Sequence, residues 1–111
     1  MNAYEIPGLR YSLPAGGAVE RHRFVTVDEN SMGIQAVANS NIIGVSMNKT
    51  SAGQVLEIAD GIVMVEAAKA VTAGSIAYAD ANGKVTDTGT VVAGIVITSA
   101  VAGGLAAVKI N

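Results

Sequence analysis

The chain has 111 residues, no cysteine and a formal net charge of −2 at pH 7. This length suits one domain with a modest core, and the lack of cysteine excludes disulfides and thiolate metal sites. No basic stripe is present of the kind that neutralises phosphates, so we expect no nucleic-acid partner. Hydrophobic residues make up 50% but aromatics only 4%. Because small side chains bury little area, we expect stability to come partly from a partner surface or from further copies.

Residues 1–18 differ in pattern from the rest of the chain. Proline and glycine punctuate them, and their apolar residues follow no sustained period. We therefore predict an extended N-terminal arm, whose aromatic residues favour docking over solvation. The sequence leaves open whether the arm docks on another protein, on a sister subunit or, as an edge strand, on its own domain. The proposed contacts are Tyr4, Ile6, Leu9, Tyr11 and Leu13.

Residues 19–111 form the predicted β domain, and the run from Val19 to Val27 opens it. Its residues alternate, beginning polar and ending apolar, as in a strand that enters a core. His22, the only histidine, lies here between two arginines. Zinc requires three or four ligands, and no cysteine or carboxylate pair is near. We therefore interpret His22 as a solvated strand residue.

Short apolar runs separated by turn residues follow. Turns are predicted at Asp28–Ser31 and Asn39–Asn41, and strands at Gly33–Ala38 and Ile42–Met47. Lys49 lies in the polar loop after the second of these strands.

The stretch Val55–Glu66 joins the two halves of the chain. Two runs rich in Val, Ile, Leu and Met meet at Asp60-Gly61, a pair that favours the positive φ angles of a tight turn. Neither run has helical spacing. We therefore predict a β-hairpin with its turn at Asp60 and Gly61.

Two further turns are predicted in the second half. Asn82-Gly83 is the preferred pair of a type I′ hairpin turn. Gly103 and Gly104 are expected to form the turn between the last two strands. The uncharged run Gly89–Val108 is long enough to span a membrane, but its glycines and β-branched residues favour strand, turn and strand. We therefore expect no membrane segment.

The two halves share a pattern of glycines and apolar runs. The pattern predicts a pseudo-repeat of residues 24–58 and 75–110. With closely spaced turn signals and no long helical pattern, it indicates an all-β fold, either a small β-barrel or a β-sandwich (β-tulip-like), built from two similar halves. The matching glycines are Gly33 and Gly83, Gly44 and Gly94, and Gly53 and Gly103.

No pattern typical of an active site is present. The serines lie in predicted turns, no G-x-S-x-G elbow occurs, and the histidine lies apart from any nucleophile. No phosphate-binding glycine loop or dinucleotide fingerprint appears. We therefore predict no enzymatic activity, no metal and no cofactor.

The motifs of the second half carry a family resemblance. VEAAKAVTAGSIAYADANGKV is followed by VVAGIVITSAVAGGLAAVKI. The residues that carry the pattern are Val71, Ala73, Gly74, Asp80, Gly83, Lys84, Val85, Gly94, Gly103 and Gly104. Through them the chain resembles the small capsid cement, or head-decoration, proteins of tailed phages. The resemblance covers residues 16–111 and leaves the arm outside.

This resemblance implies a structural virion protein on the outer surface of a phage capsid. It implies that the protein bridges neighbouring capsomers, binds the major capsid protein and itself forms homotrimers or dimers. Synthesis is then expected in the host cytoplasm, with assembly onto the virion. The arm is expected to lie along the capsid protein.

Two other functions fit parts of the sequence. A biotinyl- or lipoyl-like carrier domain is also a duplicated β fold, and Met47-Asn48-Lys49 faintly matches the biotin motif, although the second flanking methionine is absent. A module of a phage fibre or baseplate is the second alternative, and it is structural as well.

Overall fold

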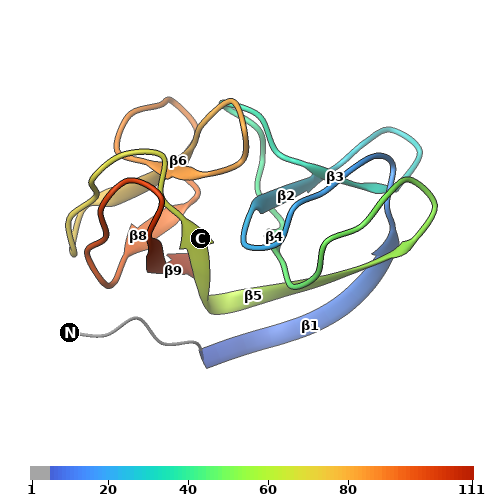
Figure 1. Ribbon diagram of the computed structural model, residues 1–111, viewed down its shortest axis with the longest axis horizontal. Coiled ribbons are helices and arrows are strands. Elements are labelled where there is room, and N and C mark those ends of the chain that lie inside the picture. Colours follow the sequence, from blue (N-terminus) through green and yellow to red (C-terminus); the bar gives the residue numbers. More distant parts are fainter. Residues whose placement is uncertain (1–5) are drawn as a thin grey trace.

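The computed structural model describes residues 6–111, which form a curled antiparallel sheet of nine strands (Figure 1). Within these residues there is no helix, so the prediction of an all-β fold is confirmed. The strands are β1 (Ile6–Pro14), β2 (Phe24–Val27), β3 (Gly33–Gln35), β4 (Gly44–Ser46), β5 (Val55–Glu66), β6 (Ile76–Ala79), β7 (Val85–Thr86), β8 (Gly94–Val96) and β9 (Leu105–Ile110).

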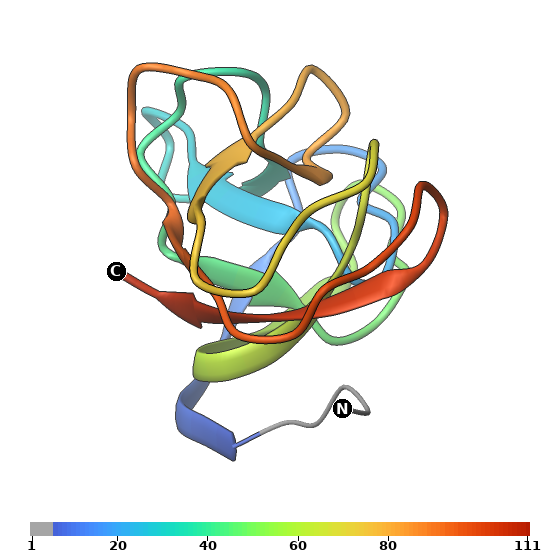
Figure 2. The ribbon, with the colours of Figure 1, turned by 90° about the vertical axis from the view of Figure 1, so that its left-hand side faces the viewer.

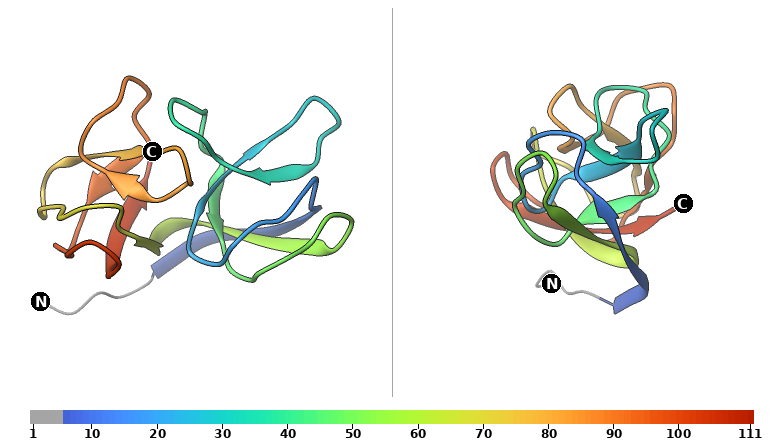
Figure 3. Two further views of the ribbon diagram at one scale, coloured as in Figure 1. Left: turned by 45° about the horizontal axis from the view of Figure 1, so that its top comes forward. Right: turned by 90° about the vertical axis from the view of Figure 1, so that its right-hand side faces the viewer.

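The sheet curls into two half-barrel lobes that share β5 (Figure 3). The strand order is β3-β2-β4-β5-β9-β8-β6-β7, and β1 also pairs with β5. The first lobe, residues 6–59, is called the first repeat below. The second lobe, residues 62–110, is called the second repeat.

Equivalent backbone hydrogen bonds join equivalent residues in the two repeats, so the prediction of two similar halves is confirmed. Val19 donates its N–H to Thr50 O at 3.0 Å in the first repeat, and Val71 donates to Ala100 O at 2.9 Å in the second. The repeat also begins earlier than predicted. β1 pairs with the last strand of its repeat just as the second part of β5 pairs with β9. Further equivalent pairs are Ala15 and Ala67, Gly44 and Gly94, and Gly53 and Gly103.

Aspartate-centred turns, rather than glycines, set the alignment of the β2–β3 and β6–β7 hairpins. Asp28 Oδ1 accepts two backbone N–H groups from the residues that follow it, and Asp80 Oδ1 does the same in the second repeat. The residues with positive φ in these turns are Ser31 (63°) and Gly83 (73°). The counterpart of Gly83 is therefore Ser31, and its predicted match with Gly33 is wrong by two residues.

The prediction of a hairpin at Asp60-Gly61 is wrong. β5 runs for 12 residues without reversing, and it pairs with β4 before this point and with β9 after it. Gly61 does have a positive φ of 94°, but here it bends a strand instead of closing a turn. The strand continues because β1, β4 and β9 supply partners on both sides of the bend.

Asn82 and Gly83 lie in the hairpin loop between β6 and β7, but the loop is not a type I′ turn. That type needs positive φ at both central residues, and of the two only Gly83 has it. Asp80 O accepts the Gly83 N–H at 3.2 Å, and Asp80 donates its own N–H to Lys84 O at 2.9 Å. This is a three-residue loop that ends on a left-handed glycine, and the Asp80 carboxylate caps it.

Gly103 and Gly104 lie in the turn between β8 and β9. Gly103 has φ of 82°, and Gly104 donates its N–H to Val101 O at 2.9 Å. The uncharged run around this turn is strand, turn and strand. Within the described part of the chain, no helix has the length and hydropathy to cross a membrane.

Most of the predicted arm belongs to the sheet, which is the alternative in which the arm docks as a strand on its own domain. Residues 6–14 form β1, which pairs with β5 over nearly its whole length. Ala15 is only 1% exposed and already contributes to the core. The open edge of β5 explains this outcome, because β1 satisfies backbone groups that would otherwise lack a partner within the chain.

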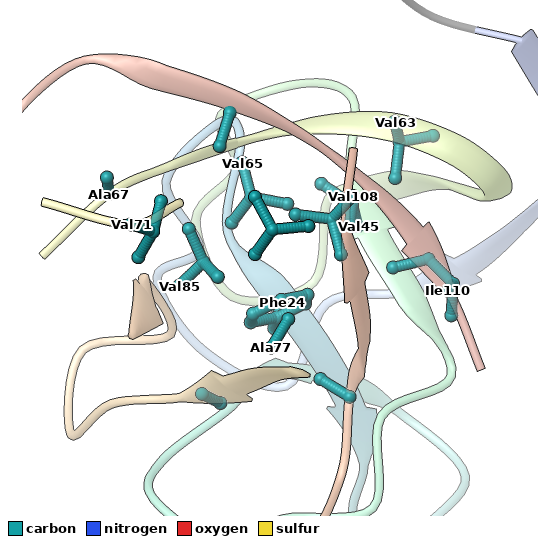
Figure 4. Packing of buried hydrophobic residues seen from close by; sticks show 14 of the residues in the cluster. Phe24, Val45, Val63, Val65, Ala67, Val71, Ala77, Val85, Val108 and Ile110 are labelled. Carbon is teal, nitrogen blue, oxygen red and sulfur yellow. The ribbon is translucent and has the colours of Figure 1, made fainter. Parts of the chain in front are cut away.

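The core consists of one small and one large cluster of apolar side chains. The small cluster fills the first repeat and contains Val25, Leu56 and Ile58. The large cluster fills the second repeat and also includes Phe24 from the first. Figure 4 shows the Phe24 ring beside Ala77 within this cluster. The ring is fully buried, so it joins the two lobes through a shared core.

Replacing Gly83 with valine should lower the free energy of unfolding by about 2–4 kcal/mol. The position has positive φ, and a Cβ there would lie 3.0 Å from Gln35 Cγ and 3.2 Å from Phe24 O. Gly53→Val is the matched control, because Gly53 has φ of 83° but no atom within 4 Å of an added Cβ. Chemical denaturation measures the unfolding free energy of both variants. Equal losses would show that crowding of the new side chain against the first repeat does not contribute to the effect of Gly83→Val.

Replacing Phe24 with alanine should cost about 3–5 kcal/mol of unfolding free energy, as for other buried aromatic side chains. Its counterpart in the second repeat, Ile76, is 48% exposed. Ile76→Ala should cost less than about 1 kcal/mol at low protein concentration. Thermal or urea unfolding tests the pair, and similar losses would contradict the role of Phe24 in joining the lobes.

Candidate interaction surfaces

The five predicted contact residues of the arm have different surroundings. Tyr4 lies outside the described residues. Ile6 lies opposite Ile62 at the start of β1. Leu9 is 59% exposed, and its backbone N–H donates to Asp60 Oδ1 at 2.7 Å, beside an irregularity in the strand pairing. Of these three residues, Leu9 is the one whose side chain is shown to project outward.

Tyr11 and Leu13 pack on the chain's own first repeat. Both are half-buried and contact its small core cluster. The Tyr11 hydroxyl donates to Ile43 O at 2.7 Å. Burial, and secondarily the nearby Asp60 carboxylate, raises the pKa of Tyr11 above its ordinary value. These two side chains pack on the domain itself and stabilise the fold.

A row of isoleucines crosses the outer face of the second repeat. Ile76 lies opposite Ile95, Ile95 opposite Lys109, and Lys109 opposite Ile62, on four neighbouring strands. Figure 2 looks onto this repeat, with β9 lying beside β5. Ile76 and Ile95 are each 48% exposed, and Ile62 is half-buried. These four residues are called the isoleucine row below.

The sequence analysis missed the isoleucine row. β8 reads Gly94-Ile95-Val96, in which apolar residues occupy both faces, so periodicity does not identify the exposed one. Only the strand register places the three isoleucines on one face.

A charged cluster joins the repeats at the end of β5. Glu66 Oε2 lies 3.0 Å from Lys84 Nζ, and Glu66 Oε1 lies 3.5 Å from Arg23 Nη2. The Glu66 N–H also donates to His22 O at 3.0 Å. The hydrogen bond from Lys84, and then the positive charges of Arg23 and Lys84, hold the pKa of Glu66 below its ordinary value, although partial burial opposes this.

Comparison with known proteins identifies the family. A family model described as phage cement protein matches residues 5–110. The chain belongs to the phage cement protein family. This makes it a structural protein of the phage virion, and it confirms the resemblance found in the sequence. The match includes β1, which the sequence analysis left outside the resemblance.

A solved structure shows the same fold as this cement-family protein. It is described as the head fiber gp8.5 N base in bacteriophage phi29. The TM-score is 0.77, the sequence identity is 16%, and the match covers 93% of each chain. No curated protein matches the sequence.

The structure also places the polar residues of this cement-family protein that the sequence suggested as a metal ligand or a modified lysine. Within residues 6–111, no three His, Asp or Glu side chains lie close enough together to hold a metal ion. His22 precedes β2 instead of lying within a strand, and its φ is 62°. The side chain of Lys49 is 75% exposed in a loop, and its Nζ lies 3.7 Å from Glu20 Oε2.

Stability should fall at low pH through Glu66. Its pKa is lowered by folding, so the unfolded chain binds the proton more readily. The stabilising contribution is therefore complete above the ordinary pKa of 4.5 and is lost as pH falls through the lowered value. Glu66→Gln should lower the melting temperature at neutral pH and reduce its acid dependence. Glu57→Gln, an exposed carboxylate on the same strand, is the control. If the melting temperature depended on pH identically in the wild type and in both variants, Glu66 would not be the source of the acid sensitivity.

Proposed function

We propose that this protein binds the outer surface of a phage capsid and stabilises the contacts between neighbouring capsomers. The match of residues 5–110 to the phage cement protein family is the observation that carries the proposal. The partner is the major capsid protein, and the role is structural, with no catalysis and no cofactor. The protein is made in the host cytoplasm and joins the shell during assembly.

Mass action explains how such a protein stabilises a shell. A ligand that binds the assembled state and not the separated subunits shifts the equilibrium toward assembly, by an amount set by its concentration and affinity. Stiff antiparallel strands suit this role, because little conformational freedom remains to be lost on binding. The modest net charge of −2 also limits repulsion between copies on one particle.

β1 supports the capsid contact proposed here. It lies beside β5 and presents Leu9 outward, at the end that continues into Tyr4 and the N-terminus. Tyr4, Ile6 and Leu9 therefore form the proposed capsid contact. Tyr11 and Leu13 are withdrawn from it, because they pack on the domain itself.

A fibre base is the second candidate function. The likeness to the phi29 head fiber N base supports it, because that fold also belongs to a protein named for the phage head. On this alternative the domain attaches to the head and carries a projection. Images of decorated particles distinguish the two, because a cement protein adds compact knobs that join capsomers.

Purified protein should co-sediment with undecorated phage shells and raise the temperature at which they disrupt. Leu9→Asp should weaken this binding, because the charge must be desolvated against the capsid. Val37→Asp is the matched control, since Val37 is 58% exposed and Leu9 is 59% exposed. Failure of the wild-type protein to bind any shell would overturn the proposed function. Equal binding by both variants would overturn only the contact at Leu9.

A further inference from the structure

The contact between the two repeats is asymmetric, because each repeat contributes a different surface to it. The first repeat contributes the backbone of Phe24, whose N–H donates to Gly83 O at 2.8 Å, and the second contributes its β6–β7 hairpin loop. The counterparts of these residues, Ile76 and Ser31, do not meet each other within the chain, since both are exposed. The interface is therefore head to tail, and each repeat keeps a different face unused.

The unused face of the second repeat is the isoleucine row. In the first repeat Phe24 lies opposite Val45, and Val45 opposite Ala59, and all three are 0% exposed because the second repeat covers them. The same register in the second repeat gives Ile76, Ile95 and Lys109, which are exposed. A face that one repeat buries is thus left apolar and uncovered on the other.

The first repeat is complementary to this row in size. Between the two repeats, the side chain that inserts becomes smaller where the residues that line the receiving core become larger. Phe24 enters a second repeat whose cluster is lined by Ala106 and Val108. Their counterparts in the first repeat are the larger Leu56 and Ile58, which leave room only for a shallower contact. The side chain that would contact Leu56 and Ile58 is Ile76, which is smaller than Phe24.

We propose that the isoleucine row binds the first repeat of a second copy of this chain, repeating between chains the contact that joins the repeats within one. The contact between chains is weaker than the internal one, because Pro14 takes the place of Glu66. Proline has no N–H to donate and no carboxylate to pair, so two of the internal contacts have no counterpart. Head-to-tail contacts of this kind close into a ring when the rotation per subunit permits. The proposal does not depend on binding to a capsid.

Analytical ultracentrifugation of the free protein over a dilution series tests the association. Wild type should show reversible, concentration-dependent self-association, and Ile95→Glu should weaken it by at least about tenfold, because a charge would be buried without a partner. Val101→Glu is the control, since Val101 is 72% exposed on the β8–β9 turn, away from the row. A wild-type protein that stays monomeric, or equal effects of the two variants, overturns the proposal. Loss of shell binding by Ile95→Glu with a monomeric wild type would assign the row to the capsid instead.

Cross-linking tests the direction of the contact. The chain has no cysteine, so thiols introduced by Ile76→Cys and Ser31→Cys are the only reactive ones. These positions correspond to Phe24 and Gly83, which touch within the chain. A short thiol-reactive cross-linker should give dimers when the two single variants are mixed, and not with either alone. Dimers of Ile76→Cys alone would indicate a symmetric contact and overturn the head-to-tail arrangement, as would the absence of dimers from the mixture.

Discussion

Burial of the Phe24 ring inside the second repeat is the contact on which the rest of this structure depends. Each repeat by itself is a half-barrel of short strands with mostly small side chains, and such a unit buries too little apolar area to be stable alone. The ring adds a large apolar surface to the core of the second repeat and at the same time closes that half-barrel. The shared strand β5 and the cluster around Glu66 hold the lobes in the register that this burial requires.

Duplication gives the protein two versions of one interface with different sequences. Within the chain, the Phe24 ring inserts deeply against small residues of the second repeat, and the charged cluster around Glu66 adds ion pairs. In the exposed version, the smaller Ile76 takes the place of Phe24, and Pro14, which cannot form ion pairs, takes the place of Glu66. The contact within the chain and the proposed reversible contact between chains thus differ by a few side chains at equivalent positions. This division suits a virion protein, which must stay soluble until it joins an ordered surface.

The proposed capsid contact and the proposed self-association use different parts of the molecule. The proposed capsid contact lies at the exposed part of β1, whereas the isoleucine row crosses β6, β8, β9 and β5. Ile62 lies opposite Ile6 on one side and Lys109 on the other, so the two surfaces adjoin at β5. A copy bound through both surfaces would tie its neighbours to the shell and to one another, and the affinities would reinforce through their high effective concentration.

The sequence by itself determined the strand-rich composition, the duplication, the family and the places of the turns at Gly83 and Gly103, because these depend on local propensity and on residue identity. It did not determine whether Asp60-Gly61 reverses the chain, because a glycine with positive φ serves equally to bend a strand, and the partners of β5 decide between the two. It also did not determine that β1 belongs to the sheet or that Ile76 is exposed while Phe24 is buried. Burial of an apolar residue depends on what lies opposite it, and strands distant in the sequence meet only in the tertiary structure.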